Sequence, residues 1–146
     1  MLSSLANFIT NETDALAQME LGELRSILQS GRYVTEEQNG QPVGFACWKL
    51  SEKSQQPWKA SFKFRNMMLL EYMVVRDDVQ RQGIGTRLLY SIEKIARYYN
   101  RNALAVGVPI KNVKAQRFFQ YNDWGYLGLA NDNDMTWKIY TYDMKE

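Results

Sequence analysis

The sequence contains no histidine and only one cysteine, Cys47. Without histidine, neither a Ser-His-Asp nor a Cys-His catalytic arrangement can form, and a transition-metal site is not expected, because imidazole is the commonest metal ligand in proteins. A lone cysteine cannot form an internal disulfide, which fits a reducing compartment. We therefore expect a cytoplasmic protein that holds no metal.

Long apolar runs and a strong charge of one sign are also missing. No stretch approaches the roughly 18 consecutive apolar residues of a membrane span, and the N-terminus lacks a basic segment followed by an apolar one. The formal net charge is only +2, from 18 basic and 16 acidic residues, so neither nucleic acid nor an anionic membrane is an expected partner. The length of 146 residues predicts a single domain over residues 1–146, with no repeat or linker.

The stretch 68–100 is the most informative part of the chain. Met68–Val75 is an apolar run with a single charge, which is typical of a buried strand. After a polar turn and Gly83-Ile84-Gly85, the spacing of apolar residues changes from two to about 3.6. The pattern predicts a strand, a glycine turn and an amphipathic helix. The apolar stripe of that helix consists of Ile84, Leu88, Leu89, Ile92, Ile95, Ala96 and Tyr99.

This arrangement suits an anion. The first turn of a helix carries backbone N–H groups without partners and a partial positive charge. Glycines let a diphosphate approach the backbone, and Arg81 adds a full charge. A P-loop is excluded because no Gly-Lys-Ser/Thr follows, and a dinucleotide fingerprint is excluded because Leu88 stands where its third glycine belongs. A turn whose glycines serve only packing is the alternative.

The rest of the chain predicts alternating helices and strands. Residues 2–30 carry helical signals that end at Gly31. Asn39-Gly40 indicates a hairpin, Pro109 ends a buried strand, and Asn112 is a good helix cap. The expected elements are a hairpin of 32–37 and 43–50, a further strand start at 61–64, a strand at 103–108, a helix at 112–121, and a hairpin of 126–129 and 135–144.

Two motifs carry a family resemblance. Gln80-Arg81-Gln82-Gly83-Ile84-Gly85 resembles motif A of the Gcn5-related N-acetyltransferases (GNAT), written Gln/Arg-x-x-Gly-x-Gly/Ala. The later segment Asn112-x-x-Ala115-x-x-Phe118-Phe119, followed by Gly125-Tyr126, is similar to a second family pattern. The resemblance covers about residues 31–144. It implies the α+β GNAT fold, with a central mixed, mostly antiparallel twisted sheet of six to seven strands flanked by about four helices.

The resemblance also implies acetyl-CoA as the donor. Its pyrophosphate would lie on the turn, and its pantetheine arm would pair with the preceding strand. A plain helix cap also explains Asn112, and core packing also explains Phe119. The implied cofactor-binding residues are Met73, Val74 and Val75 on the strand, Gln80, Arg81, Gln82, Gly83, Ile84, Gly85 and Thr86 in the turn, and Asn112 and Phe119 on the later helix.

The implied activity is direct acetyl transfer to a primary amine: a small molecule, a peptide N-terminus or a protein lysine. Glu71 is the one acid on the central strand, and alternation places it on a face with Met73 and Val75. Burial in an apolar run raises the pKa of a carboxyl group, which suits a general base; a solvated or ion-paired carboxylate is the alternative.

The proton donor is less well matched. Many family members carry a tyrosine that protonates the thiolate, but the corresponding residue here is Phe119, which cannot donate a proton. Tyr121 is the nearest candidate. A catalytically weak CoA-binding module with a GNAT fold therefore stays open as the alternative function, as does an assembly or toxin–antitoxin partner that pairs through an exposed edge strand near the C-terminus. A homodimer also stays open. The family's first strand is also unclear: either Phe8-Ile9-Thr10 supplies it, or the sheet lacks that edge.

Overall fold

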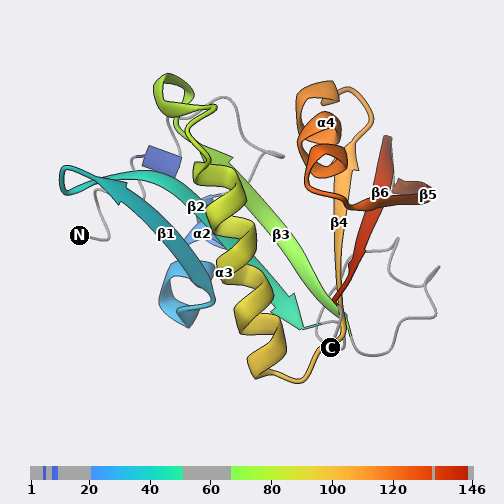
Figure 1. The fold of residues 1–146 in the computed structure, drawn as a ribbon, viewed down its shortest axis with the longest axis horizontal. Coiled ribbons are helices and arrows are strands. Elements are labelled where there is room, and N and C mark those ends of the chain that lie inside the picture. Colours follow the sequence, from blue (N-terminus) through green and yellow to red (C-terminus); the bar gives the residue numbers. More distant parts are fainter. Residues whose placement is uncertain (1–4, 6–7, 10–20, 51–66, 133, 145–146) are drawn as a thin grey trace. The chain divides into compact units, whose positions relative to one another are not determined.

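The structure is a computed structural model that describes residues 5, 8–9, 21–50, 67–132 and 134–144. Strands alternate with helices in the middle of the chain, and a hairpin of two strands precedes and follows this part (Figure 1). The elements are α2 (Leu21–Ser30), β1 (Tyr33–Gln38), β2 (Gln41–Leu50), β3 (Met67–Val75), a short 3-10 helix η3 (Asp77–Val79), α3 (Ile84–Tyr98), β4 (Ala103–Pro109), α4 (Val113–Tyr121), β5 (Gly125–Asp132) and β6 (Met135–Asp143).

The strands form one mixed sheet in the order β1-β2-β3-β4-β6-β5. β3 and β4 are parallel, whereas β1 with β2, β4 with β6 and β5 with β6 are antiparallel. The predicted α+β fold is confirmed, with six strands. Three α-helices, α2, α3 and α4, have described bounds, and Leu5, Phe8 and Ile9 are also helical; about four helices were expected.

The chain forms two compact units. The first unit comprises Met1–Trp48 and Tyr72–Ile92, and the second comprises Lys49–Glu71 and Glu93–Glu146. β3 passes from the second unit to the first between Glu71 and Tyr72, and α3 passes back between Ile92 and Glu93. The single domain over residues 1–146 stays a prediction.

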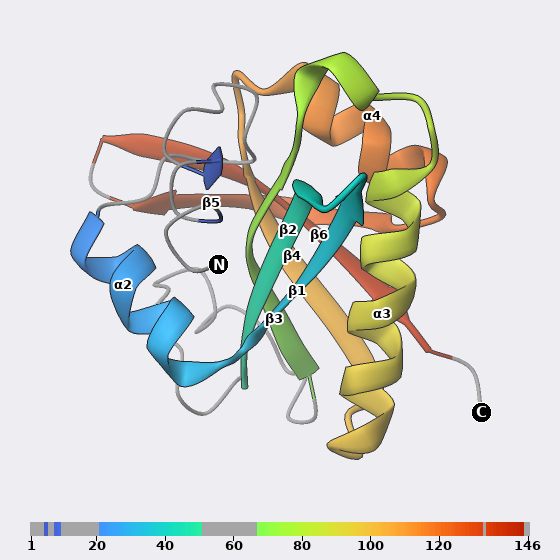
Figure 2. The same ribbon diagram turned by 90° about the vertical axis from the view of Figure 1, so that its left-hand side faces the viewer.

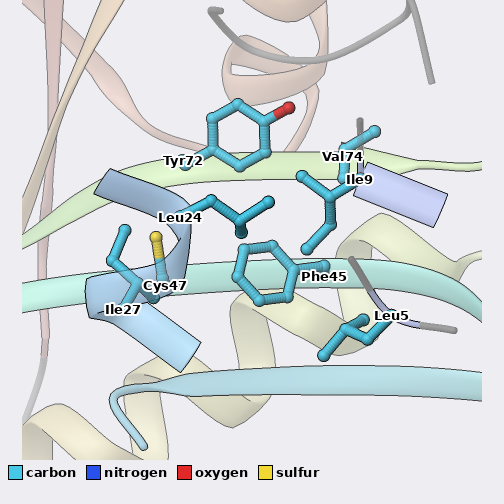
Figure 3. Close-up of a cluster of buried hydrophobic side chains, with 8 residues drawn as sticks. All are labelled: Leu5, Ile9, Leu24, Ile27, Phe45, Cys47, Tyr72 and Val74. Carbon is cyan, nitrogen blue, oxygen red and sulfur yellow. The ribbon is translucent and has the colours of Figure 1, made fainter. Parts of the chain in front are cut away.

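Apolar side chains of α2 and of two strands form the core of the first unit. Leu24 and Ile27 of α2 pack with Phe45 of β2 and with Tyr72 and Val74 of β3 (Figure 3). The helix ends where the sequence predicted, because Gly31 adopts a left-handed φ of 74° that stops the helical backbone. Burying this apolar stripe stabilises the helix against the sheet.

A two-residue turn joins β1 to β2. Asn39 and Gly40 both have positive φ, 52° and 75°, which is the backbone that a tight hairpin requires and that Asn-Gly favours. β2 begins two residues earlier than predicted and includes Pro42, which pairs with Glu37. The register shifts between Glu36 and Glu37, opposite this proline, which has no N–H to donate to the ladder.

The second unit contains two clusters of side chains, one apolar and one aromatic. Met67 and Leu69 of β3 cluster with Ala103 and Ala105 of β4 and with Ile139 of β6. The predicted final hairpin is confirmed, with Asp132 of β5 paired to Met135 of β6. An aromatic cluster forms between α4, the segment that follows it, and the last two strands; it contains Phe118, Phe119, Trp124, Tyr126, Tyr140 and Tyr142.

Two predictions concern the edges of the described chain. Phe8 and Ile9 are helical, so the idea that they supply a first strand is wrong, and within the described ranges no strand precedes β1. The expected strand start at 61–64 lies outside the described residues. None of the helices in the described ranges has the length and apolar character that crossing a membrane requires.

Candidate functional site

The first half of the segment between β3 and α3 is held in place by a backbone hydrogen bond, a buried side chain and an ion pair. The backbone N–H of Arg76 donates to the carbonyl of Val43 in β2, 2.8 Å away. The short helix η3 follows and buries Val79, while the carboxylate of Asp78 accepts from the guanidinium of Arg76. The sequence predicted only a polar turn here; a single buried valine is too weak a pattern to predict a 3-10 turn.

The predicted glycine turn is confirmed, and it is sharply bent. Arg81 and Gly83 both adopt left-handed backbone, with φ of 70° and 78°. Such a conformation suits glycine but is unfavourable for arginine by about 1 kcal/mol or more. The side-chain amide of Gln80 donates to the carbonyl of Val75 (3.2 Å), which ties the turn to the end of β3. A strained residue in an exposed turn points to a functional role.

The exposed turn leads directly into the start of a helix. Arg81, Gln82 and Gly83 are exposed, and α3 begins at Ile84, as predicted. The N–H groups of Ile84 and Gly85 lie in the first helical turn, where no intrahelical acceptor exists. Among the backbone hydrogen bonds of turns, loops and caps in the described part of the chain, none has the N–H of Gln82 or Gly83 as its donor. This arrangement of backbone donors can bind a phosphate group.

A glycine in β2 sets how closely the start of α3 approaches the sheet. Gly44 is buried, and a Cβ atom built on it would lie 2.8 Å from Cγ2 of Ile84 and 3.1 Å from Cδ1 of Leu88. A side chain at this position would therefore displace the first turns of the helix. Sequence analysis gave Gly44 no role, because the contact joins elements far apart in the chain.

Two side chains from β1 also reach this region. Arg87 of α3 donates from Nε to Oε1 of Glu36 (2.7 Å) and from Nη1 to the carbonyl of Gln82 (3.2 Å). The side chains of Gln38 and Gln82 form a further hydrogen bond of 3.0 Å. Sequence analysis missed these contacts. The spacing of Gly83 and Arg87 is the available signal, since a helical side chain leans toward the N-terminus.

The ladder between β3 and β4 covers only part of β3. It pairs Met67–Leu70 with Ala103–Val106, and β3 then continues to Val75. Backbone groups after Leu70 lie outside that ladder. The predicted binding residues Met73 and Val74 have buried side chains, and Val75 is half-buried, so their backbones are the parts suited to pairing with an extended ligand.

The other predicted site residues belong to the second unit. Asn112 caps α4, because its Oδ1 accepts from the N–H of Ala115 (3.0 Å). Phe119 is only 1% exposed and packs against Tyr140 and Trp124, as the packing interpretation expects. Tyr121, at the end of α4, is 84% exposed. The donor-binding role of Asn112 and Phe119 and the acid role of Tyr121 stay predictions.

Glu71 lies at the end of the second unit's part of β3. The residue is half-buried, and its Oε1 atom is shielded from solvent. Leu69 and Met73, which share its face of the strand because side chains alternate, are 0% and 7% exposed. A carboxylate in these surroundings has the chemistry of a general base, and that role also stays a prediction.

Two tyrosines of β6, the buried Tyr140 and the half-buried Tyr142, have shifted acidity. Burial raises the pKa of Tyr140 above its ordinary value, partly offset by a hydrogen bond from Gln120. Burial also raises the pKa of Tyr142, and the nearby carboxylate of Glu93 raises it further. Both hydroxyls are therefore protonated at neutral pH, and neither is a ready base.

Solved structures resemble the whole chain. The ribosomal-protein-S18-alanine N-acetyltransferase from Escherichia coli has a TM-score of 0.70 at 18% identity, covering 100% of this chain and 90% of its own. The aminoglycoside acetyltransferase AAC(6')-Ib, solved with coenzyme A and kanamycin, gives 0.74 at 14% identity, with 97% and 88% covered. An agmatine N-acetyltransferase gives 0.74 at 12% identity, with 99% and 95% covered. At these identities the likeness shows the fold.

No curated protein sequence matches the chain. The model of the acetyltransferase (GNAT) family matches residues 4–126. This range includes β3, the turn, the start of α3 and all of α4, which are the segments that carried the resemblance in the sequence. The chain therefore belongs to the acetyltransferase (GNAT) family.

Proposed function

We propose that this protein transfers an acetyl group from acetyl-CoA directly to a primary amine. The observation that carries the proposal is the exposed turn of residues 81–83 at the start of α3, in a chain of the GNAT family. Family membership supports acetyltransferase activity, and the turn supports a donor that carries a diphosphate. When bound, acetyl-CoA would supply an activated thioester.

The residues of the turn fit a diphosphate. The N–H groups of Gly83, Ile84 and Gly85 belong to the start of a helix, where the helix dipole favours negative charge. Arg81 is exposed and brings a guanidinium to the same segment. Among the described residues, the only atom within 4 Å of a Cβ built on Gly83 is Nη1 of Arg87, at 3.5 Å, which leaves room for a bulky anion on that side of the backbone.

The strand before the turn fits the amide-bearing pantetheine arm. An extended ligand with alternating amides can pair with strand backbone as an added strand does. The backbone from Met73 to Val75 lies beyond the ladder that joins β3 to β4. The carbonyl of Val75 already accepts from Gln80, so we assign the pairing to the groups of Met73 and to the N–H of Val75.

The acceptor amine must lose a proton before it attacks. An alkylamine with a pKa of about 10.4 is neutral in roughly one molecule in two thousand at pH 7. We assign Glu71 as the base that accepts this proton, directly or through water. The amine nitrogen then bonds to the acetyl carbon, the carbon–sulfur bond breaks, and the thiolate leaves; Tyr121 is our candidate for the group that protonates it.

One observation favours a second function, a CoA-binding module with weak catalysis. The position where many family members place a tyrosine is Phe119, which has no proton to donate and is buried in the aromatic cluster. Tyr121 stands in solvent at the end of α4. If no group protonates the thiolate, CoA binding would persist while turnover would be slow.

An amine panel with acetyl-CoA separates the two functions. The names of the structural relatives suggest kanamycin, agmatine and a peptide with N-terminal alanine as its first members, with a lysine peptide added. We expect thiol release that depends on one of these amines. Tight CoA binding by calorimetry with no release for any amine would support the binding module instead, and the absence of CoA binding would contradict both.

A further inference from the structure

Arg87 and Glu36 form a bridge between the proposed diphosphate turn and the β1–β2 hairpin. Arg87 lies on the second turn of α3, and its guanidinium contacts Glu36 through Nε and the carbonyl of Gln82 through Nη1. All these atoms belong to the first unit. The hairpin and the start of α3 can be followed in Figure 2. The bridge is thus a direct link from an edge strand to the turn.

The local structure explains why Glu36 can reach Arg87. Glu36 is the cross-strand partner of Gly44, and a Cβ atom on Gly44 would be 3.5 Å from the Cβ of Glu36. Because Gly44 has no side chain, α3 approaches the sheet closely beside Glu36. The register shift between Glu36 and Glu37 is the kind of irregularity that re-aims a strand side chain.

The hydrogen bond to Gln82 fixes the direction of a donor in the turn. All peptide bonds in the described chain are trans, so the carbonyl of Gln82 and the N–H of Gly83 point in opposite directions across one rigid plane. When Arg87 holds that carbonyl, it also holds the orientation of the Gly83 N–H. A carbonyl turned the other way would present a partial negative charge to an anion.

We propose that Arg87, held by Glu36, is a positioning residue for the diphosphate of the donor, and that the β1–β2 hairpin is therefore part of the donor site. Arg87 acts through the backbone of Gln82 and Gly83. The inference rests on the proposed function, because it takes the ligand of the turn to be CoA. The hydrogen bond between Gln38 and Gln82 (3.0 Å) is a second link from the same strand.

The expected effect is modest. The Arg87 and Glu36 side chains are 54% and 29% exposed, and water screens ion pairs at such sites. We expect the Arg87→Met variant to bind CoA about fivefold more weakly, a change within the range of one partly exposed, charge-assisted contact. Arg87→Lys keeps the charge but cannot reproduce the fork that holds two partners, so its loss should be intermediate.

The test measures dissociation constants by calorimetry for CoA and by competition for pantetheine, which has no diphosphate. Arg87→Met should weaken CoA binding and leave pantetheine binding unchanged. Glu36→Ala should weaken CoA binding less, and should add nothing in the Arg87→Met background, because both changes break one bridge. Glu36→Gln keeps an acceptor oxygen and should restore most of the affinity. Glu37→Ala, at the exposed neighbouring position, is the matched control and should have no effect.

The outcomes separate this inference from the proposed function. If the wild-type protein does not bind CoA, the proposed function fails and the inference fails with it. If the wild-type protein binds CoA but Arg87→Met and Glu36→Ala bind it equally well, only the inference is overturned. An equal loss for CoA and pantetheine would also overturn it, because a general disturbance of the site would then explain the change. Thermal unfolding of each variant confirms that the proteins compared are folded.

Discussion

Gly44 of β2 lies directly against Ile84, the first residue of α3. A Cβ atom on Gly44 would be only 2.8 Å from Cγ2 of Ile84 and 3.1 Å from Cδ1 of Leu88, and all three residues are buried. The branched Cγ2 methyl cannot rotate away on its own, because it sits on a stiff side chain. The position of the first turn of α3 against the sheet therefore depends on Gly44 having no side chain, although Gly44 lies forty residues earlier in the chain.

Replacing Gly44 by alanine tests this contact between β2 and α3. The added methyl group should overpack the contact and lower the free energy of unfolding by about 1–3 kcal/mol. It should also weaken CoA binding, because the first turn of α3 must move outward. Urea unfolding and calorimetry with CoA measure the two effects. Gly22→Ala is the control: Gly22 lies in α2, no atom of the described residues is within 4 Å of a built Cβ, and alanine there should stabilise the helix by up to about 1 kcal/mol.

Replacing Gly83 by glutamate should abolish CoA binding. The carboxylate would stand in the turn where the diphosphate is proposed to bind, and a close pair of like charges costs several kcal/mol, or roughly a hundredfold or more in affinity. Gly83 also has a φ of 78°, so part of the damage could come from backbone strain. Gly31→Glu carries the same strain at a φ of 74° and should leave CoA affinity intact. A folded Gly83→Glu protein with wild-type affinity would contradict the site.

Local patterns predicted most of the elements that carry the site. The strand before the turn, the start of α3 at Ile84 and the cap at Asn112 each depend on residues within a few positions, so periodicity and cap chemistry suffice. The hairpin turn was predictable for the same reason, because Asn39-Gly40 suits positive φ.

Long-range contacts were not predictable in this way. Glu36 and Arg87 are fifty-one residues apart, and nothing in either residue's neighbourhood indicates the pairing. The sequence around Gly44 is that of an ordinary strand, and only the folded structure brings α3 against it. The sequence left two roles open for Phe119, because an aromatic residue at helical spacing can also face a ligand although it more often packs in the core; its burial against Tyr140 favours the core.

The tyrosine at position 140 should make the stability of the protein sensitive to alkaline pH. Its pKa is raised in the folded state by burial, so the folded protein keeps the proton when the unfolded chain has lost it. The stabilisation is fully present below a pH of about 10, the ordinary tyrosine pKa, and is lost as pH rises toward the raised value. Tyr140→Phe should show a smaller fall in unfolding free energy above this pH, measured by urea titrations. Tyr98→Phe, which removes a hydroxyl from a residue that is 81% exposed, is the control.

Two substitutions at Asn112 separate a structural cap from a ligand contact. Asn112→Ala removes the acceptor for the Ala115 N–H and should lower the free energy of unfolding by about 1 kcal/mol. Asn112→Ser keeps a capping oxygen but loses the amide group, so it should be nearly as stable as the wild type. If Asn112 also binds the pantetheine region, Asn112→Ser should still weaken CoA binding. If Asn112→Ser binds CoA with wild-type affinity, Asn112 acts only as the cap of α4.

Glu71→Gln tests the proposed base. Glutamine has nearly the same shape but cannot accept a proton, so kcat should fall by about a hundredfold, in the range that general base catalysis contributes. The CoA dissociation constant should stay the same, because Glu71 precedes the strand segment assigned to the donor. The pH profile of kcat is the decisive measurement, made with whichever amine of the panel turns over. The wild type should lose activity on the acid side as the carboxylate takes up a proton, and its kcat should level off at higher pH. In the variant the amine must lose its proton to solvent, so kcat should keep rising with pH toward the pKa of the amine, about 10.4. A variant that keeps the wild-type pH profile and most of the rate would remove Glu71 from the mechanism.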